Sequence, residues 1–116
     1  MASDQQTTAS SSAAAGRAVS ISFQQQLEIG PLQTLRFDKL VSDSRCPIGA
    51  HCIAAGEAVL AFTLNVAGKS EQFQITSGKP AVLVQGLRFS LAAVEPVPRV
   101  HIQTPETAYK ATVLIN

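Results

Sequence analysis

The chain has 116 residues, 46% of them hydrophobic and 15% charged, with a formal net charge of +1. This length suits one domain. The nine Lys and Arg residues are scattered along the chain, so nothing predicts a basic patch, and nucleic-acid binding is not expected. No stretch approaches the ~20 consecutive apolar residues that a bilayer span needs, so no transmembrane segment is predicted.

Residues 1–17 are rich in Ser, Thr, Ala and Gln. Such a composition predicts a disordered tether, or a segment added for expression, followed by a single β domain at residues 18–116. The first residues lack the basic and apolar regions of a signal peptide. Because the cysteines described below indicate export, we expect that an export signal has been removed and a start methionine added. The tether is compatible with a lipid anchor at the removed N-terminus.

From Val19 onward, apolar and polar residues alternate with a period of two, which predicts strands with one buried face. The longest alternating row lies within residues 57–66. A turn at residues 67–69 separates it from a second run at 70–76, and the two form a predicted hairpin. Three prolines between residues 96 and 105 mark a longer connection before the last strand. The other alternating runs are residues 19–23, 32–41, 87–93 and 109–115.

The six aromatic residues fall one to each main run, as expected if they fill a core between two sheets. They are Phe23, Phe37, Phe62, Phe73, Phe89 and Tyr109. Glycine and proline punctuate the chain at short intervals, and no strong helical period is present. The pattern predicts an all-β fold, either a two-layer antiparallel β-sandwich or a flattened barrel of about seven or eight strands. We expect a monomer.

Both cysteines, Cys46 and Cys52, lie in one short segment with Pro47 and Gly49 between them. These turn formers bring the two residues close together, which favours a disulfide. A loop of this size contributes about 2 kcal/mol. A metal site that includes His51, a redox pair and two free thiols are the alternatives. Zinc wants four ligands and redox pairs are typically C-x-x-C, so no metal or cofactor is predicted. A disulfide indicates a periplasmic, outer-membrane-anchored or secreted protein.

Asp43 and Arg45 flank this loop. In a structural role, Asp43 accepts backbone N–H bonds and Arg45 pairs with Asp43 or Glu57. In a functional role, Arg45 anchors a ligand. Asp43, Arg45 and His51 are therefore the candidate interaction residues, with the structural role favoured for the first two. Residues 43–52 are expected to hold a long crossover in register at one end of the sandwich.

The segment also resembles a known signature. The string DSRCP at residues 43–47, Cys52 and the string AGEA at residues 55–58 are similar to a motif of uncharacterised short bacterial secreted or lipoprotein-like proteins. The resemblance covers residues 32–66 well and residues 87–116 loosely. It implies export and one domain, and it brings no activity with it. Those proteins often have tryptophan at the position of Ala54, so a binding surface that uses this aromatic is altered or absent here.

A search for catalytic patterns finds no nucleophile elbow, zinc-protease motif, P-loop or dinucleotide fingerprint, and no enzyme is predicted. We expect a small exported envelope module that binds an unknown protein or other envelope ligand through loops on a rigid β scaffold. One alternative is a periplasmic inhibitor of a protease or lysozyme, in which residues 1–16 enter the active-site cleft. A second alternative is an enzyme with an unrecognised site.

Overall fold

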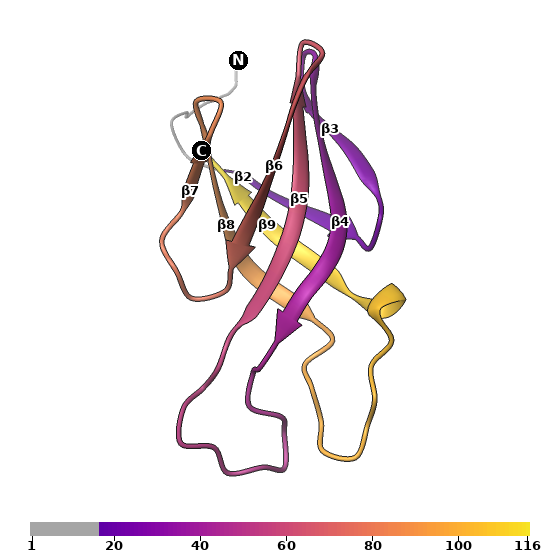
Figure 1. Ribbon diagram of the computed structural model, residues 1–116, viewed down its shortest axis with the longest axis vertical. Helices are drawn as coiled ribbons and strands as arrows, with labels where there is room; N and C mark the ends of the chain where they lie inside the picture. Colours follow the sequence, from indigo (N-terminus) through magenta and orange to yellow (C-terminus); the bar gives the residue numbers. More distant parts are fainter. Residues whose placement is uncertain (1–16) are drawn as a thin grey trace, which may run out of the picture.

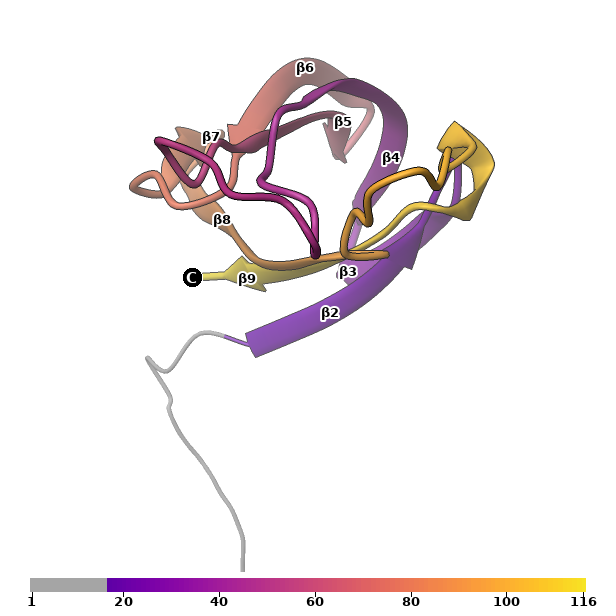
Figure 2. The ribbon, with the colours of Figure 1, turned by 90° about the horizontal axis from the view of Figure 1, so that it is seen from below.

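The computed structural model describes residues 17–116, which form two four-stranded sheets packed face to face (Figures 1 and 2). One sheet has the strand order β2-β9-β8-β7 and the other β3-β4-β5-β6, and every neighbouring pair is antiparallel. The elements are β2 (Arg17–Ser22), β3 (Gln26–Gly30), β4 (Gln33–Asp43), β5 (Ala58–Val66), β6 (Lys69–Thr76), β7 (Val82–Val84), β8 (Leu87–Glu95), the 3₁₀ helix η2 (Glu106–Ala108) and β9 (Lys110–Ile115).

The predicted all-β sandwich is confirmed, and the sheets do not close into a barrel. The predicted hairpin is also present, because β5 and β6 pair in register from Val66 and Lys69 outward. The tether assigned to residues 1–17 falls almost entirely outside the described residues. Arg17 is its one described residue, and it already belongs to β2, where it pairs with Ile115 of β9.

Strand β5 follows its sequence pattern most closely. Its even-numbered residues, from Ala58 to Leu64, are buried, and the odd-numbered residues between them are only partly buried. Cross-strand pairing aligns Phe62 with Phe37 of β4 and Phe73 of β6. The alternation in the sequence therefore becomes one apolar face turned toward the other sheet.

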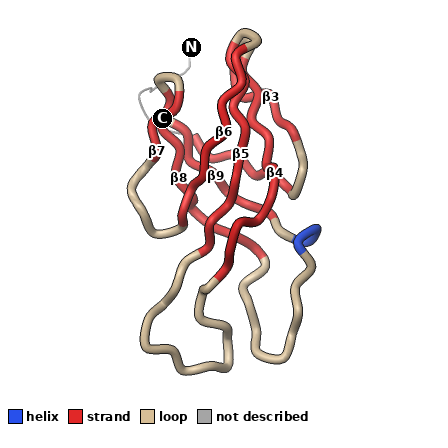
Figure 3. Tube along the Cα trace, in the orientation of Figure 1, coloured by secondary structure: helices blue, strands red, loops and turns tan. Residues whose placement is uncertain are grey.

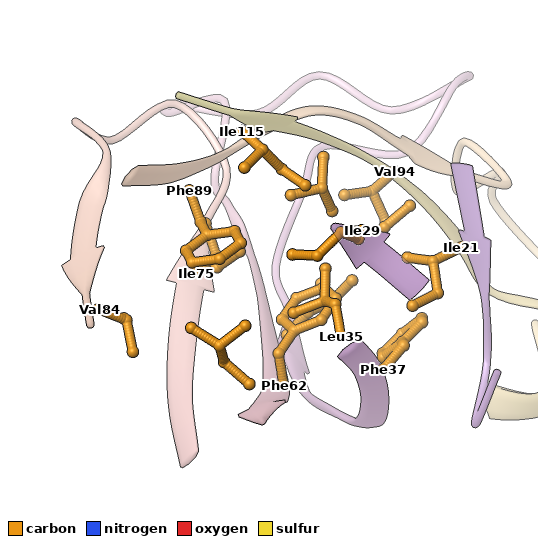
Figure 4. Close-up of a cluster of buried hydrophobic side chains, with 14 of the residues drawn as sticks. Ile21, Ile29, Leu35, Phe37, Phe62, Ile75, Val84, Phe89, Val94 and Ile115 are labelled. Atoms are coloured by element: carbon orange, nitrogen blue, oxygen red, sulfur yellow. The ribbon is translucent and has the colours of Figure 1, made fainter. Parts of the chain in front are cut away.

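Five phenylalanines cross the core in a continuous line. The successive ring centroids from Phe23 through Phe37, Phe62 and Phe73 to Phe89 are 5.0–5.9 Å apart. Branched aliphatic side chains from both sheets fill the space around the rings (Figure 4). Rings at these spacings add roughly 0.5–1.5 kcal/mol per pair beyond the area that they bury.

The register of β4 shifts twice, between Phe37 and Lys39 and between Leu40 and Ser42. Each shift is a bulge that adds one residue and changes the phase of the alternation. Leu40 therefore packs against the core, although it lies three residues beyond buried Phe37. The strand continues to Asp43, which pairs with Ala58 at the start of β5.

The prediction that residues 43–52 hold a long crossover in register is wrong. Strands β4 and β5 are direct neighbours in one sheet, so residues 44–57 form the loop of a long hairpin, named here the β4–β5 loop. A second long connection, the β8–η2 loop of residues 96–105, lies at the same end of the molecule (Figure 3). The chain enters β2 at the opposite end. Among residues 17–116, no helix is long and apolar enough to cross a membrane.

Candidate functional site at the paired loops

The β4–β5 loop begins as an extension of the hairpin ladder. The Ser44 amide donates to the Glu57 carbonyl at 2.8 Å, and the Cys46 amide donates to the Ala55 carbonyl at 2.8 Å. Gly56 permits this close approach, because its φ of +72° favours glycine and a Cβ there would collide with the Ser44 carbonyl oxygen. The root of the loop is therefore fixed by backbone contacts that leave no room for a side chain.

Beyond this ladder, a disulfide joins Cys46 and Cys52, whose Cα atoms are 5.9 Å apart. The predicted disulfide is thus confirmed, and its sulfurs are neither free thiols nor thiolate ligands. Within the bridged segment, the Ala50 amide donates to the Pro47 carbonyl at 3.1 Å. His51 is exposed in the same segment. The bridge and the turn restrict the loop without help from the core.

The two long loops are joined to each other through their backbones. The Ile48 amide donates to the Pro98 carbonyl at 2.8 Å, and the Val100 amide donates back to the Ile48 carbonyl at 3.1 Å. Gly49 lies against the same contact, since a Cβ there would be 2.9 Å from Val100 Cγ2. Segments about 50 residues apart in sequence therefore form one structural unit at this end of the sandwich.

Arg45 anchors this unit to both sheets. Its Nε and Nη2 donate to the two carboxylate oxygens of Asp43, at 2.9 and 2.8 Å. Nη1 donates to the Val94 carbonyl at 2.7 Å, and Nη2 also donates to the Pro96 carbonyl at 3.0 Å. Because Asp43 ends β4 and Val94 lies on β8, the guanidinium group bridges the two layers where the loops start. Its rigid, multiply donating fork suits this position.

Asp43 receives further hydrogen bonds at the same point. The Tyr109 hydroxyl donates to Asp43 Oδ2 at 2.7 Å, and the Arg45 amide donates to Oδ1 at 3.2 Å. Burial raises the pKa of Asp43, but the hydrogen bonds from Arg45 and Tyr109 outweigh it and leave the pKa below its ordinary value. Burial, followed by the hydrogen bond to Asp43, raises the pKa of Tyr109. Asp43 therefore stays ionised and Tyr109 protonated at neutral pH.

The candidate residues thus occupy two different positions. Asp43 and Arg45 meet at the root of the loops, with side chains only 9% and 17% exposed, while His51 lies in the exposed part of the β4–β5 loop. Of the two partners considered for Arg45, the structure provides Asp43, and Glu57 instead lies 3.9 Å from Lys79. These contacts occupy four of the five N–H groups of Arg45 and favour its structural role.

The sequence patterns did not identify four of the exposed apolar side chains of the two loops. Ile53 is fully exposed, and Ile48, Val100 and Ile102 are 50%, 36% and 62% exposed. These four residues are called the aliphatic tip below. The available signal was their setting, since isoleucine and valine stand here among proline, glycine, alanine and histidine, outside any alternating strand. Because these residues lie outside any alternating run, the sequence pattern does not assign them to a buried face.

Elsewhere, an open hollow lies on the outer face of the sheet formed by β3, β4, β5 and β6. Polar side chains line it: Gln26, Thr34, Arg36, Thr63, Asn65 and Ser70. Such residues are usual on the solvent face of a sandwich. In residues 17–116, no group of three His, Cys, Asp or Glu side chains is placed to hold a metal ion. The inhibitor alternative depends on residues 1–16 and lies outside the described residues.

Searches against protein-family models, curated proteins and solved structures found no match to this chain.

Proposed function

We propose that the protein is a small exported binding module of the bacterial envelope, and that its paired loops carry the binding surface. One observation carries the proposal: the aliphatic tip projects into solvent from loops that are fixed in place. The sandwich buries its other isoleucines, Ile21, Ile29, Ile75 and Ile115, almost completely. Ile48 and Val100 are brought together by the backbone hydrogen bonds between the two loops, and exposed apolar patches typically mark interaction sites.

The rigidity of the loops supports the proposal. A loop that is already ordered loses little conformational entropy when it binds, so more of the contact energy appears as affinity. Three devices order these loops: the Cys46–Cys52 bridge, the backbone bonds between Ile48 and the β8–η2 loop, and the Arg45 contacts to both sheets. These contacts hold the loops that carry the aliphatic tip in place on the sandwich.

The proposed location follows from the disulfide, which forms and persists in oxidising compartments. We infer a periplasmic, outer-membrane-anchored or secreted monomer. Because β2 begins at the end of the molecule opposite the loops (Figure 1), attachment through the N-terminus would point the loops away from the anchor. The binding surface would then remain open to its ligand.

Photo-crosslinking tests the proposal. A photoreactive amino acid replaces Ile53 in one variant and Leu32 in a control variant, and each is illuminated with a bacterial envelope extract. Leu32 is 74% exposed in the turn between β3 and β4. We expect a defined adduct from position 53 and none from position 32. Equal adducts from both positions, or none from position 53, would contradict a binding role for the loops.

A further inference from the structure

We propose that the outer face of the sheet formed by β3, β4, β5 and β6 binds a saccharide chain that bears carboxylate groups. This inference goes beyond the proposed function, because it concerns a second surface and uses no residue of the paired loops. It is drawn from two adjoining hollows on this face, from the hydrogen bonds between the side chains that line them, and from the two cations along them.

The two hollows adjoin and form one groove across β4, β5 and β6, named here the outer-face groove. The first hollow is the polar one described above, with a volume of about 490 Å³. The second, of about 400 Å³, is lined by Asp38, Lys39, Gln72, Gln74 and Ala61 and bordered by Phe62 and Phe73. They meet at one cross-strand row, because Arg36 and Thr63 of the first hollow are in register with Gln72 of the second. The groove therefore lies on strands, which hold side chains more precisely than loops do.

Hydrogen bonds already order part of the groove. The Asn65 side-chain amide donates to Ser70 Oγ at 2.8 Å. Thr63 Oγ1 donates to Asp38 Oδ2, and Asp38 Oδ1 lies 3.6 Å from Arg36 Nε. These contacts link β4 to β5 and β5 to β6 across the floor of the groove and limit the rotamers of the side chains. Less conformational entropy is therefore lost when a ligand binds.

Other polar side chains of the groove remain available to a ligand. Among residues 17–116, the side-chain hydrogen bonds of the groove are those of Thr63, Asp38, Asn65 and Ser70. The carboxamides and the hydroxyl without such bonds belong to Gln26, Thr34, Gln72 and Gln74. Carboxamide and hydroxyl groups each donate and accept hydrogen bonds, as the hydroxyl groups of a sugar also do. The groove therefore matches a ligand that carries hydroxyl groups along its length.

The charges of the groove favour carboxylates on this saccharide. Among residues 17–116, the Arg36 guanidinium group has one ionic partner, Asp38, which lies 3.6 Å from Nε, so both Nη groups can still donate. Lys39 is exposed and forms no ion pair with a described residue. Asp38 is the one acid that lines the groove, and Glu28 of β3 lines a separate hollow. An arginine with free N–H groups suits a carboxylate, which it can bind through two parallel hydrogen bonds.

Two other classes of ligand fit this groove less well. Nucleic acids are held through several phosphate contacts, and only two cations line the groove. The centres of protein interfaces are apolar and enriched in aromatic residues. The aromatic residues that border the groove, Phe62 and Phe73, stack against each other in the core with ring centroids 5.9 Å apart. The groove itself presents hydroxyl, carboxamide and charged groups.

Titration of the isotope-labelled protein with trigalacturonate, followed by NMR, tests the inference, and neutral galactotriose is the comparison ligand. We expect trigalacturonate to shift the amide signals of β4, β5 and β6, and galactotriose to bind about tenfold more weakly. Arg36→Gln should weaken the binding of trigalacturonate about tenfold, which corresponds to the loss of a hydrogen-bonded contact to a charged group. The matched control is Arg88→Gln, which removes an exposed arginine from β8 in the other sheet and should bind like the wild type.

Three results would overturn the inference: no shifts with trigalacturonate, equal binding of the acidic and neutral trisaccharides, or equal affinities of Arg36→Gln and the wild type. A photoreactive residue at position 72 that crosslinks to an envelope protein, without any saccharide-induced shift, would assign this face to a protein partner instead. Ile53→Ser should bind trigalacturonate as tightly as the wild type does, and weaker binding would place the saccharide at the paired loops and reject the groove. Failure of the saccharide titration together with a crosslink from position 53 would leave the proposed function standing.

Discussion

Replacing Arg45 with methionine removes the guanidinium group that joins the two sheets and keeps most of the apolar stem. Four N–H···O bonds are lost, two to the Asp43 carboxylate and one each to the Val94 and Pro96 carbonyls. The Asp43 carboxylate is only 9% exposed and keeps the Tyr109 hydroxyl and one backbone amide as partners. The variant therefore leaves a poorly solvated charge without its counter-ion.

The size of the effect follows from this geometry. Removing one partner of a buried ion pair costs about 3–5 kcal/mol, and water that reaches the root of the loops offsets part of this. We expect Arg45→Met to lower the free energy of unfolding by about 3 kcal/mol, as measured by urea denaturation at neutral pH. The midpoint of thermal unfolding should fall by more than about 10 °C for a domain of this size.

Arg36→Met is the matched control, because Arg36 also faces an aspartate two residues away. Its Nε lies 3.6 Å from Asp38 Oδ1, and its side chain is 50% exposed on the outer face of the sheet. Exposed pairs of this kind contribute about 0–1 kcal/mol. Equal losses in the Arg45 and Arg36 variants would refute the conclusion that Arg45 ties the two sheets together.

Three further outcomes are expected. The pKa of Asp43 in the folded protein lies below its ordinary value of 3.8, so the stability that Asp43 contributes is complete above pH 3.8 and is lost as the pH falls through the folded pKa. In urea titrations from pH 7 to 2, Asp43→Asn should remove this loss of stability at low pH. Gly56→Ala should destabilise by about 1–3 kcal/mol more than Gly68→Ala, since both have positive φ but only Gly56 would collide with backbone. Cys46→Ser together with Cys52→Ser should cost about 2 kcal/mol by the same assay.

The controls for these outcomes are direct. A wild type and an Asp43→Asn variant with identical acid curves would show that another carboxylate governs the acid limb. Equal losses in the two glycine variants would mean that the loop root relaxes around the new methyl group. Reduction of the wild type by dithiothreitol should match the double serine variant, and a reduced protein as stable as the oxidised one would show that the bridge does not stabilise the fold.

The parts of the fold that sequence predicts best are the long strands with one buried face. Strand β5 alternates without interruption, so its face and its hairpin with β6 follow directly from the sequence. Strands β3 and β7 lack that signal, because the first has two apolar residues in five and the second is three residues long. The bulges of β4 break the alternation near its end, and the pairing of β4 with β5 as a hairpin is not indicated by the sequence of the long loop between them.

The candidate site was predictable only in its local parts. The spacing of the cysteines and the turn formers between them indicated the bridge, and the short separation of Asp43 and Arg45 allowed their pairing. The contact between Ile48 and Pro98 uses backbone groups, which leave no pattern in the sequence. The hydroxyl of Tyr109 reaches Asp43 from 66 residues away, through the arrangement of the two sheets.

The most direct test of the binding surface compares Ile53→Ser with Leu32→Ser on isolated envelope membranes, after circular dichroism has confirmed that both variants fold. Bound and free protein are separated by centrifugation over a range of membrane concentrations, and the apparent affinities are compared. We predict that Ile53→Ser binds about tenfold more weakly than the wild type and that Leu32→Ser binds as tightly as the wild type. Equal binding of all three proteins would contradict the assignment of the paired loops as the binding surface.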